Sequence, residues 1–160
     1  MIDGDVRAAA EILLNTCREK GLMVATVESC TGGLVAGSLT EIAGSSNVVD
    51  RGFITYTNEA KNELVGVPMK LFRSVGAVSE EVARAMAEGG IAYSCADIAV
   101  GITGVAGPNQ SENKPAGLVH IAATRRGGDV LHERCMFDGD RSAVRKASVL
   151  KAFEMILSLI

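Results

Sequence analysis

The pattern of hydrophobic and polar positions predicts a chain that alternates between helices and strands. From about Asp5 to Lys20, apolar side chains recur at the spacing of one helix face: Val6, Ala9, Ala10, Leu13, Leu14 and Cys17. Gly21 is expected to end this helix. Similar patterns predict helices over residues 34–42, 59–65 and 79–93, and a last helix that begins near Arg141.

Short apolar runs between these helices predict strands at residues 22–27, 52–57, 97–103, 117–124 and 130–137. The last two flank Arg126-Gly127-Gly128-Asp129, which is typical of a hairpin turn, so they should be antiparallel. Early alternation of strands with helices and a late hairpin predict an α/β fold. We expect a three-layer α/β/α sandwich around a mixed, mostly parallel five-stranded sheet, formed by residues 1–160 as a single domain.

The stretch Glu28-Ser29-Cys30-Thr31-Gly32-Gly33 joins the first predicted strand to a helix. Such a turn directs free backbone N–H groups and the positive end of a helix dipole at a ligand, and its glycines allow close approach. The hydroxyl of Ser29 could attack an acyl carbon while N–H groups around Thr31, Gly32 and Gly33 hold the oxyanion. The alternative is that Thr31-Gly32-Gly33 forms only a tight, capped turn.

Other chemistries are less well supported by the sequence. His120 and His132 lie inside the predicted hairpin strands, and no G-x-S-x-G pattern surrounds Ser29, which argues against a histidine triad. No His, Asp or Glu cluster has the spacing of metal ligands, so we expect no metal and no cofactor. Cys30 is an alternative nucleophile, although a buried cysteine next to a strand is usually inert.

A lysine kept neutral by burial can activate a serine instead. Lys61 is a candidate because it follows a predicted strand end, and Tyr56 could orient or pass the proton. The structural alternatives are a solvated helix lysine and a tyrosine that fills the sheet face.

Composition limits the partners. The net charge of −3 argues against nucleic acid as a partner, and no apolar run is long enough to span a bilayer. The scattered cysteines form no C-x-x-C pair, and Asp3 and Asp5 stand where a signal peptide would be basic. We therefore expect a cytoplasmic protein, for which a homodimer is plausible.

Several motifs, in this order along the chain, resemble the CinA carboxy-terminal domain family. They are Glu28-Ser29-Cys30-Thr31-Gly32-Gly33, Ala43-Gly44-Ser45-Ser46, Arg51-Gly52-Phe53, Thr55-Tyr56-Thr57-Asn58-Glu59-Ala60-Lys61, Gly76-Ala77-Val78-Ser79, Gly104-Val105-Ala106-Gly107-Pro108, Lys114-Pro115 with Gly117, and Gly139-Asp140-Arg141. The resemblance covers essentially the whole chain. The second, amino-terminal domain that many members carry, similar to molybdopterin-binding proteins, has no counterpart in this sequence, so only the deamidase part is expected.

The resemblance implies hydrolysis of the carboxamide of nicotinamide mononucleotide, a pyridine nucleotide, to nicotinic acid mononucleotide and ammonia. It implies Ser29 as nucleophile, Lys61 as base and Tyr56 as proton relay, without a metal. For the 5′-phosphate we expect Arg141, the turn from Thr103 and Gly104 to Gly107, or Lys114. Arg141 could equally be a surface residue of the first helical turn.

Two other functions remain open from the sequence. One is a non-catalytic nucleotide-binding regulatory module of the competence/damage-inducible type, and the other is a serine hydrolase for a different small amide. The loop from Asn109 to Pro115 is expected to be exposed, and the sequence does not decide whether it covers the substrate.

Overall fold

The computed structural model describes residues 2–160. The strands are β1 (Val24–Glu28), β2 (Val49–Ile54), β3 (Ile98–Gly104), β4 (Leu118–Arg125) and β5 (Val130–Met136). The helices are α1 (Gly4–Lys20), α2 (Leu34–Thr40), α3 (Asn58–Val65), α4 (Met69–Ser74), α5 (Glu80–Ala92) and α6 (Arg141–Leu157), with a 3-10 turn η1 (Ser45–Asn47). No helix in this part of the chain is both long enough and apolar enough to cross a bilayer.

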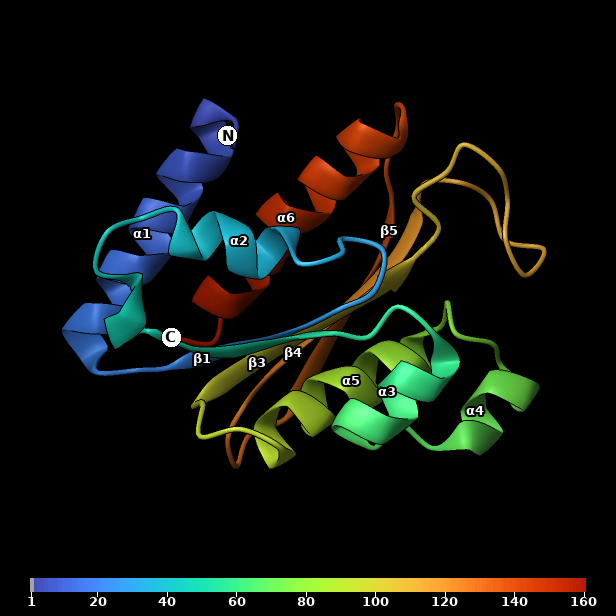
Figure 1. Ribbon diagram of the computed structural model, residues 1–160, viewed down its shortest axis with the longest axis horizontal. Helices are drawn as coiled ribbons and strands as arrows, with labels where there is room; N and C mark the ends of the chain where they lie inside the picture. The colour runs from blue at the N-terminus through green and yellow to red at the C-terminus, as the bar shows by residue number, and fades with distance from the viewer. Residues whose placement is uncertain (1) are drawn as a thin grey trace.

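The strands form one five-stranded sheet in the order β2-β1-β3-β4-β5. β1 pairs in parallel with β2 and β3, whereas β4 is antiparallel to β3 and to β5. Helices α1, α2 and α6 cover one face of the sheet, and α3, α4 and α5 cover the other (Figure 1). The predicted α/β/α sandwich around a mixed sheet is therefore confirmed, including its antiparallel hairpin.

Both faces of the central strands are buried. All five residues of β1 are inaccessible to solvent, and a large core that includes Leu13, Ile102 and Phe153 fills the space between the sheet and α1 and α6. On the other face α5 lies very close to β3. A Cβ atom at Gly101 would lie 2.7 Å from the backbone of α5, so glycine is what allows this approach.

The structure differs from the predicted elements in several places, and β1 begins at Val24 rather than at residue 22. β2 spans Val49–Ile54 rather than 52–57, because Thr55 to Thr57 leave the sheet and the Thr57 hydroxyl caps α3 by accepting from the N–H of Ala60. α2 ends at Thr40, two residues early, and the short helix α4 was not predicted.

The topology places a site at one edge of the sheet. The connection from β1 leads through α2 to β2 on one side, and the connection from β2 leads through α3, α4 and α5 to β3 on the other side of β1. The carboxyl ends of β1 and β3 therefore form a topological switch point, where open α/β sheets commonly bind ligands.

Candidate active site

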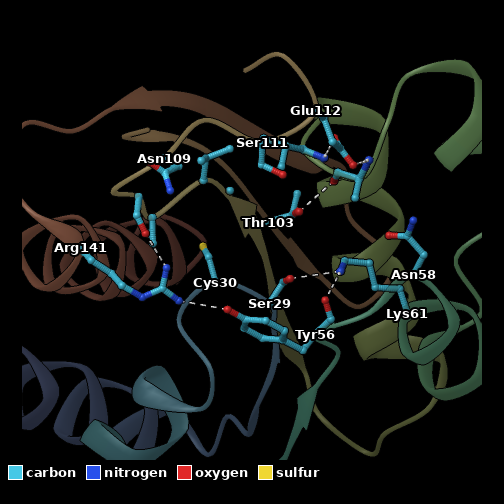
Figure 2. A pocket seen from close by; sticks show the side chains of 16 residues that line it. Ser29, Cys30, Tyr56, Asn58, Lys61, Thr103, Asn109, Ser111, Glu112 and Arg141 are labelled. Atoms are coloured by element: carbon cyan, nitrogen blue, oxygen red, sulfur yellow. Dashed lines mark hydrogen bonds between the residues drawn. The ribbon is translucent and has the colours of Figure 1, made fainter. Parts of the chain in front are cut away.

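A cavity of about 300 Å³ opens at this switch point. It is bounded by the ends of β1 and β3, the start of α3, the loop before α5, the loop after β3 and the start of α6 (Figure 2). Seven of the residues predicted for the site line it: Ser29, Tyr56, Lys61, Thr103, Gly104, Gly107 and Arg141. Four other predicted residues do not line it: Thr31, Gly32, Gly33 and Lys114.

Ser29 and Lys61 are in direct contact on the cavity floor. Ser29 follows β1, and its N–H donates to the carbonyl of Ile102 on β3 at 3.0 Å, which fixes the start of the turn. Lys61 lies in the first half of α3 and is only 1% exposed. Its Nζ lies 3.1 Å from Oγ of Ser29 (Figure 2). It also lies 2.9 Å from the carbonyl oxygen of Thr55.

The surroundings of Lys61 shift its amine toward the neutral form. Burial lowers the pKa of the side chain from its ordinary 10.5 to about 8. At pH 7 about one molecule in ten then carries the uncharged form. In that form two N–H groups can donate to backbone carbonyls, of which Thr55 is the nearest, and the lone pair can accept from the Ser29 hydroxyl. This is the geometry that general-base activation of a serine requires.

Tyr56 and Arg141 form the mouth of the cavity. The Tyr56 side chain is 57% exposed, and its hydroxyl accepts from Nη2 of Arg141 at 3.0 Å. Nη1 of Arg141 donates to the carbonyl of Gly107 at 2.7 Å. The Tyr56 hydroxyl thus points toward Arg141 and does not stand between Ser29 and Lys61 (Figure 2). In this arrangement Ser29 and Lys61 are in direct contact, and the Tyr56 hydroxyl has no hydrogen bond to either of them. A proton relay through Tyr56 therefore has no hydrogen-bonded path.

Glu28 occupies the N–H groups of the glycine-rich turn. Its buried carboxylate accepts from the N–H groups of Gly33 at 3.0 Å, Val35 at 3.0 Å and Ala36 at 2.9 Å, and so caps α2. The N–H of Gly32 donates to the carbonyl of Ser29 at 3.0 Å. The expectation that Gly32 and Gly33 hold an oxyanion is therefore wrong, since their N–H groups already have acceptors.

The remaining N–H groups of this turn belong to Cys30 and Thr31. Neither finds an acceptor in another residue between positions 2 and 160. The Thr31 side chain is fully buried, and the carbonyl of Thr31 is held by Nη2 of Arg145 at 3.0 Å. Thr31 can therefore meet a ligand only through its backbone, and its expected role as an oxyanion donor through its N–H stays a prediction.

Further cavity-lining residues were missed by the sequence reasoning: Asn58, Ala77, Val78, Asn109, Ser111 and Glu112. Ala77 and Val78 belong to the Gly76–Ser79 motif, which was the available signal. Thr103, which was predicted, contacts one of these missed residues directly, because its hydroxyl donates to the carbonyl of Ala77 at 2.8 Å.

The alternative chemistries find little support in the geometry. Cys30 lines the cavity, but burial raises the pKa of its thiol to about 11, so the thiol is protonated near pH 7. His120 and His132 contact each other at 2.9 Å on β4 and β5 and do not line the cavity. Over residues 2–160, no three His, Cys, Asp or Glu side chains are grouped as they would be around a metal ion.

A cavity at the switch point of an α/β/α fold, with a buried serine–lysine pair in it, is typical of a small α/β enzyme. The chain belongs to the CinA C-terminal domain family, whose family model matches residues 6–160. The nicotinamide-nucleotide amidohydrolase PncC of Escherichia coli strain K12 is 44% identical over 158 residues, which cover 98% of this chain and 95% of that protein.

A putative competence-damage inducible protein of Caldicellulosiruptor saccharolyticus is 44% identical over 154 residues. The match covers 95% of this chain but only 37% of that relative, so this chain spans little more than a third of the longer proteins. Among solved structures, the competence/damage inducible protein CihA from Agrobacterium tumefaciens is 48% identical, with a TM-score of 0.95 over 99% of this chain and 97% of that one.

Proposed function

We propose that this chain hydrolyses the carboxamide of nicotinamide mononucleotide to nicotinic acid mononucleotide and ammonia. The observation that carries the proposal is the 3.1 Å contact between Nζ of the buried Lys61 and Oγ of Ser29. The choice of substrate is supported by the near full-length similarity to a relative that is named nicotinamide-nucleotide amidohydrolase.

In the first half of the reaction, neutral Lys61 takes the proton of Ser29 as Oγ attacks the amide carbon. The backbone N–H groups of Cys30 and Thr31 are the available donors for the oxyanion that forms. When the tetrahedral intermediate collapses, the C–N bond breaks and Lys61 returns the proton to the leaving nitrogen. Ammonia leaves, and the nicotinoyl group remains as an ester on Ser29.

In the second half, water enters the space that ammonia has left. Lys61 removes a proton from this water, whose oxygen attacks the ester carbon. The bond to Oγ then breaks, and Lys61 returns the proton to Ser29. The products are the free acid and the original enzyme, so Lys61 acts in turn as base and acid in each half. No step requires the Tyr56 hydroxyl.

The cavity shape suggests how the nucleotide is oriented. A volume of about 300 Å³ is at the small end for ligand pockets, so it suits the pyridine ring, with the ribose phosphate nearer the mouth. Arg141 is exposed at that mouth and can exchange its contact with Tyr56 for a bidentate contact with the 5′-phosphate. We therefore assign Arg141 and Tyr56 to substrate binding.

The test is ammonia release from nicotinamide mononucleotide in the presence of a chelator, with Ser29→Ala measured beside the unaltered protein. We expect turnover by the unaltered chain, and loss of at least about a thousandfold in kcat with nucleotide binding retained in the variant. Binding without any ammonia release from the unaltered chain would support the regulatory module instead. Free nicotinamide and nicotinamide riboside, as parallel substrates, test the role of the phosphate.

A further inference from the structure

The loop between β3 and β4 is held against the rest of the molecule by the carboxylate of Glu112. Glu112, near the middle of this loop, accepts from the N–H groups of Ala77 at 3.0 Å and Val78 at 3.1 Å (Figure 2). These residues are 34 and 35 positions away in sequence. The loop was expected to be exposed, and residues 108–113 are exposed, Glu112 among them, but the Glu112 side chain also lines the cavity.

Lys114 makes a second attachment to the same segment. Its Nζ donates to the carbonyl of Val75 at 2.8 Å and to the carbonyl of Val78, and it lies 3.5 Å from the Glu112 carboxylate. Glu112 thus binds N–H groups of the 75–78 segment and Lys114 binds its carbonyl groups. We call this pair of side chains the Glu112–Lys114 clamp.

The backbone around Glu112 is shaped for this contact. Glu112 and Asn113 both have positive φ angles, 54° and 58°, between two hydrogen bonds that join Ser111 and Lys114. A left-handed conformation is unfavourable for a residue such as glutamate, and this loop uses it at Glu112 itself. Such a conformation persists when the surrounding contacts favour it, as the two N–H donors and Lys114 do here.

The 75–78 segment leaves room for the Glu112–Lys114 clamp at Gly76. Gly76 has a φ of 82°, and a Cβ atom there would lie 2.6 Å from Oε2 of Glu112 and 3.1 Å from Nζ of Lys114. Partial burial opposes ionisation of Glu112, but the two N–H groups and Lys114 outweigh it, so the pKa of the carboxyl lies below its usual value. The clamp therefore contains an ionised carboxylate near neutral pH.

Both sides of the clamp are walls of the cavity. Ala77 and Val78 line it on one side, and Asn109, Ser111 and Glu112 line it on the other. The carbonyl of Ala77 is also bound by the Thr103 hydroxyl at the end of β3. Moving Glu112 would therefore loosen a wall of the cavity without removing a hydrogen bond of Ser29 or Lys61, although the negative charge of Glu112 also acts to raise the pKa of Lys61.

We propose that Glu112 is a positioning residue, which holds the 75–78 segment and the 109–115 loop together as the outer wall of the substrate cavity. The proposal rests on the proposed function only for its kinetic consequence. Its structural consequence, protection of two particular amides, does not depend on any substrate.

The experiment compares Glu112→Ala and Glu112→Gln with Gln110→Ala, a control at an exposed position of the same loop that does not line the cavity. Amide hydrogen exchange at Ala77 and Val78 is measured by NMR. We expect exchange about tenfold faster or more in Glu112→Ala, a smaller change in Glu112→Gln, which keeps one acceptor oxygen, and no change in Gln110→Ala. Equal exchange in Glu112→Ala and the unaltered protein would overturn the proposal.

The kinetic arm measures ammonia release from nicotinamide mononucleotide. We expect KM to rise about tenfold in Glu112→Ala while kcat stays within about threefold, with Glu112→Gln in between. A fall in kcat at constant KM would instead place Glu112 in the chemistry and overturn the positioning role. If the unaltered chain releases no ammonia but the amides of Ala77 and Val78 lose protection in Glu112→Ala, the clamp stands and the proposed function fails.

Discussion

Nζ of Lys61 lies 3.1 Å from Oγ of Ser29, although the two residues are 32 positions apart in sequence. β1 delivers the serine to the edge of the sheet, and the capped start of α3 delivers the lysine from the neighbouring connection. Lys61 is also among the largest side chains that are fully buried between residues 2 and 160, and the partners of its amine are a hydroxyl and backbone carbonyls. Its burial therefore has a direct consequence for the pH at which the serine can react.

The first prediction concerns this pH dependence. Only neutral Lys61 can accept the Ser29 proton, and the pKa of Lys61 is lowered to about 8. We expect kcat/KM for the nucleotide to rise about tenfold per pH unit below this pKa and to level off above it. Initial rates between pH 6 and 9.5 measure it. Lys61→Arg, whose guanidinium stays charged, should be inactive throughout, and a rate independent of pH over this range would contradict a lysine base.

The second prediction concerns stability. Because the pKa of Lys61 is lower in the folded chain than its ordinary 10.5, the unfolded chain binds more protons between about pH 8 and 10.5. Burial of the charged ammonium therefore lowers the free energy of unfolding by its full amount below pH 8. This destabilisation disappears as the pH rises to 10.5. We expect Lys61→Met to lose activity by at least about a thousandfold, yet to be about 1–3 kcal/mol more stable than the unaltered chain at pH 7.

Urea unfolding at pH 7 and pH 10 measures this difference. The gain in stability should shrink at the higher pH, where the unaltered chain no longer buries a charge. A Lys61→Met variant that is less stable at pH 7 would mean that the amine contributes more through its hydrogen bonds than its burial costs.

Much of the fold could be predicted because its signals are local. β1 and β3 are nearly continuous apolar runs, and Gly127-Gly128 marks the hairpin between β4 and β5. α4 could not be predicted in this way, because its six residues follow Pro68 and none of them is buried, so they show no periodicity. The end of β2 was misplaced because Thr57 suits a strand and a helix cap equally well.

The candidate site was only partly predictable, for a related reason. The turn after β1 and the junction before α3 stand out in the sequence by residue type, so Ser29 and Lys61 could be named as candidates. The resemblance to the CinA family then favoured them over a capped turn and a solvated lysine. Other contacts decide which backbone N–H groups remain available to a ligand, and these contacts join residues far apart in sequence or depend on the direction of a side chain. Nothing in the order of residues indicates that Glu28 folds back onto the N–H groups of α2, or that Glu112 reaches Ala77 and Val78.

The third prediction separates the two possible roles of Tyr56. Its hydroxyl contacts Arg141 and not Lys61, so Tyr56→Phe should change kcat by less than about tenfold. Arg141→Ala should raise KM for nicotinamide mononucleotide by about tenfold or more, and by much less for nicotinamide riboside, which lacks the phosphate. Steady-state kinetics with both substrates measure this. A loss of a hundredfold or more in kcat for Tyr56→Phe, at unchanged KM, would restore the relay.

The fourth prediction excludes Cys30 as the nucleophile. Burial raises the pKa of its thiol to about 11, so less than about one molecule in a thousand holds a thiolate at pH 7. Cys30→Ala should keep kcat within a few fold. Iodoacetamide should label the exposed Cys95 first and leave ammonia release unchanged. Protection of Cys30 from labelling by the substrate, together with an inactive Cys30→Ala, would assign the reaction to the thiol.

The fifth prediction concerns Glu28, which holds the turn that carries Ser29. Its two carboxylate oxygens accept from the N–H groups of Gly33, Val35 and Ala36, and the side chain is 1% exposed. In Glu28→Gln one of these oxygens becomes an NH₂ group, which would face a backbone donor instead of accepting from it. We expect the variant to be less stable by about 2–3 kcal/mol, since a buried donor is left without an acceptor.

Urea unfolding measures this loss, and Glu41→Gln is the matched control. Glu41 is exposed and forms only a surface ion pair with Arg7 at 3.6 Å, so the same chemical change there should alter stability by less than about 0.5 kcal/mol. Because the cap also fixes the turn, kcat of Glu28→Gln should fall by about tenfold even under conditions where the variant is fully folded. If both variants behave alike, the α2 cap is not what holds Ser29 against Lys61, and the contact of Ser29 with β3 must be enough.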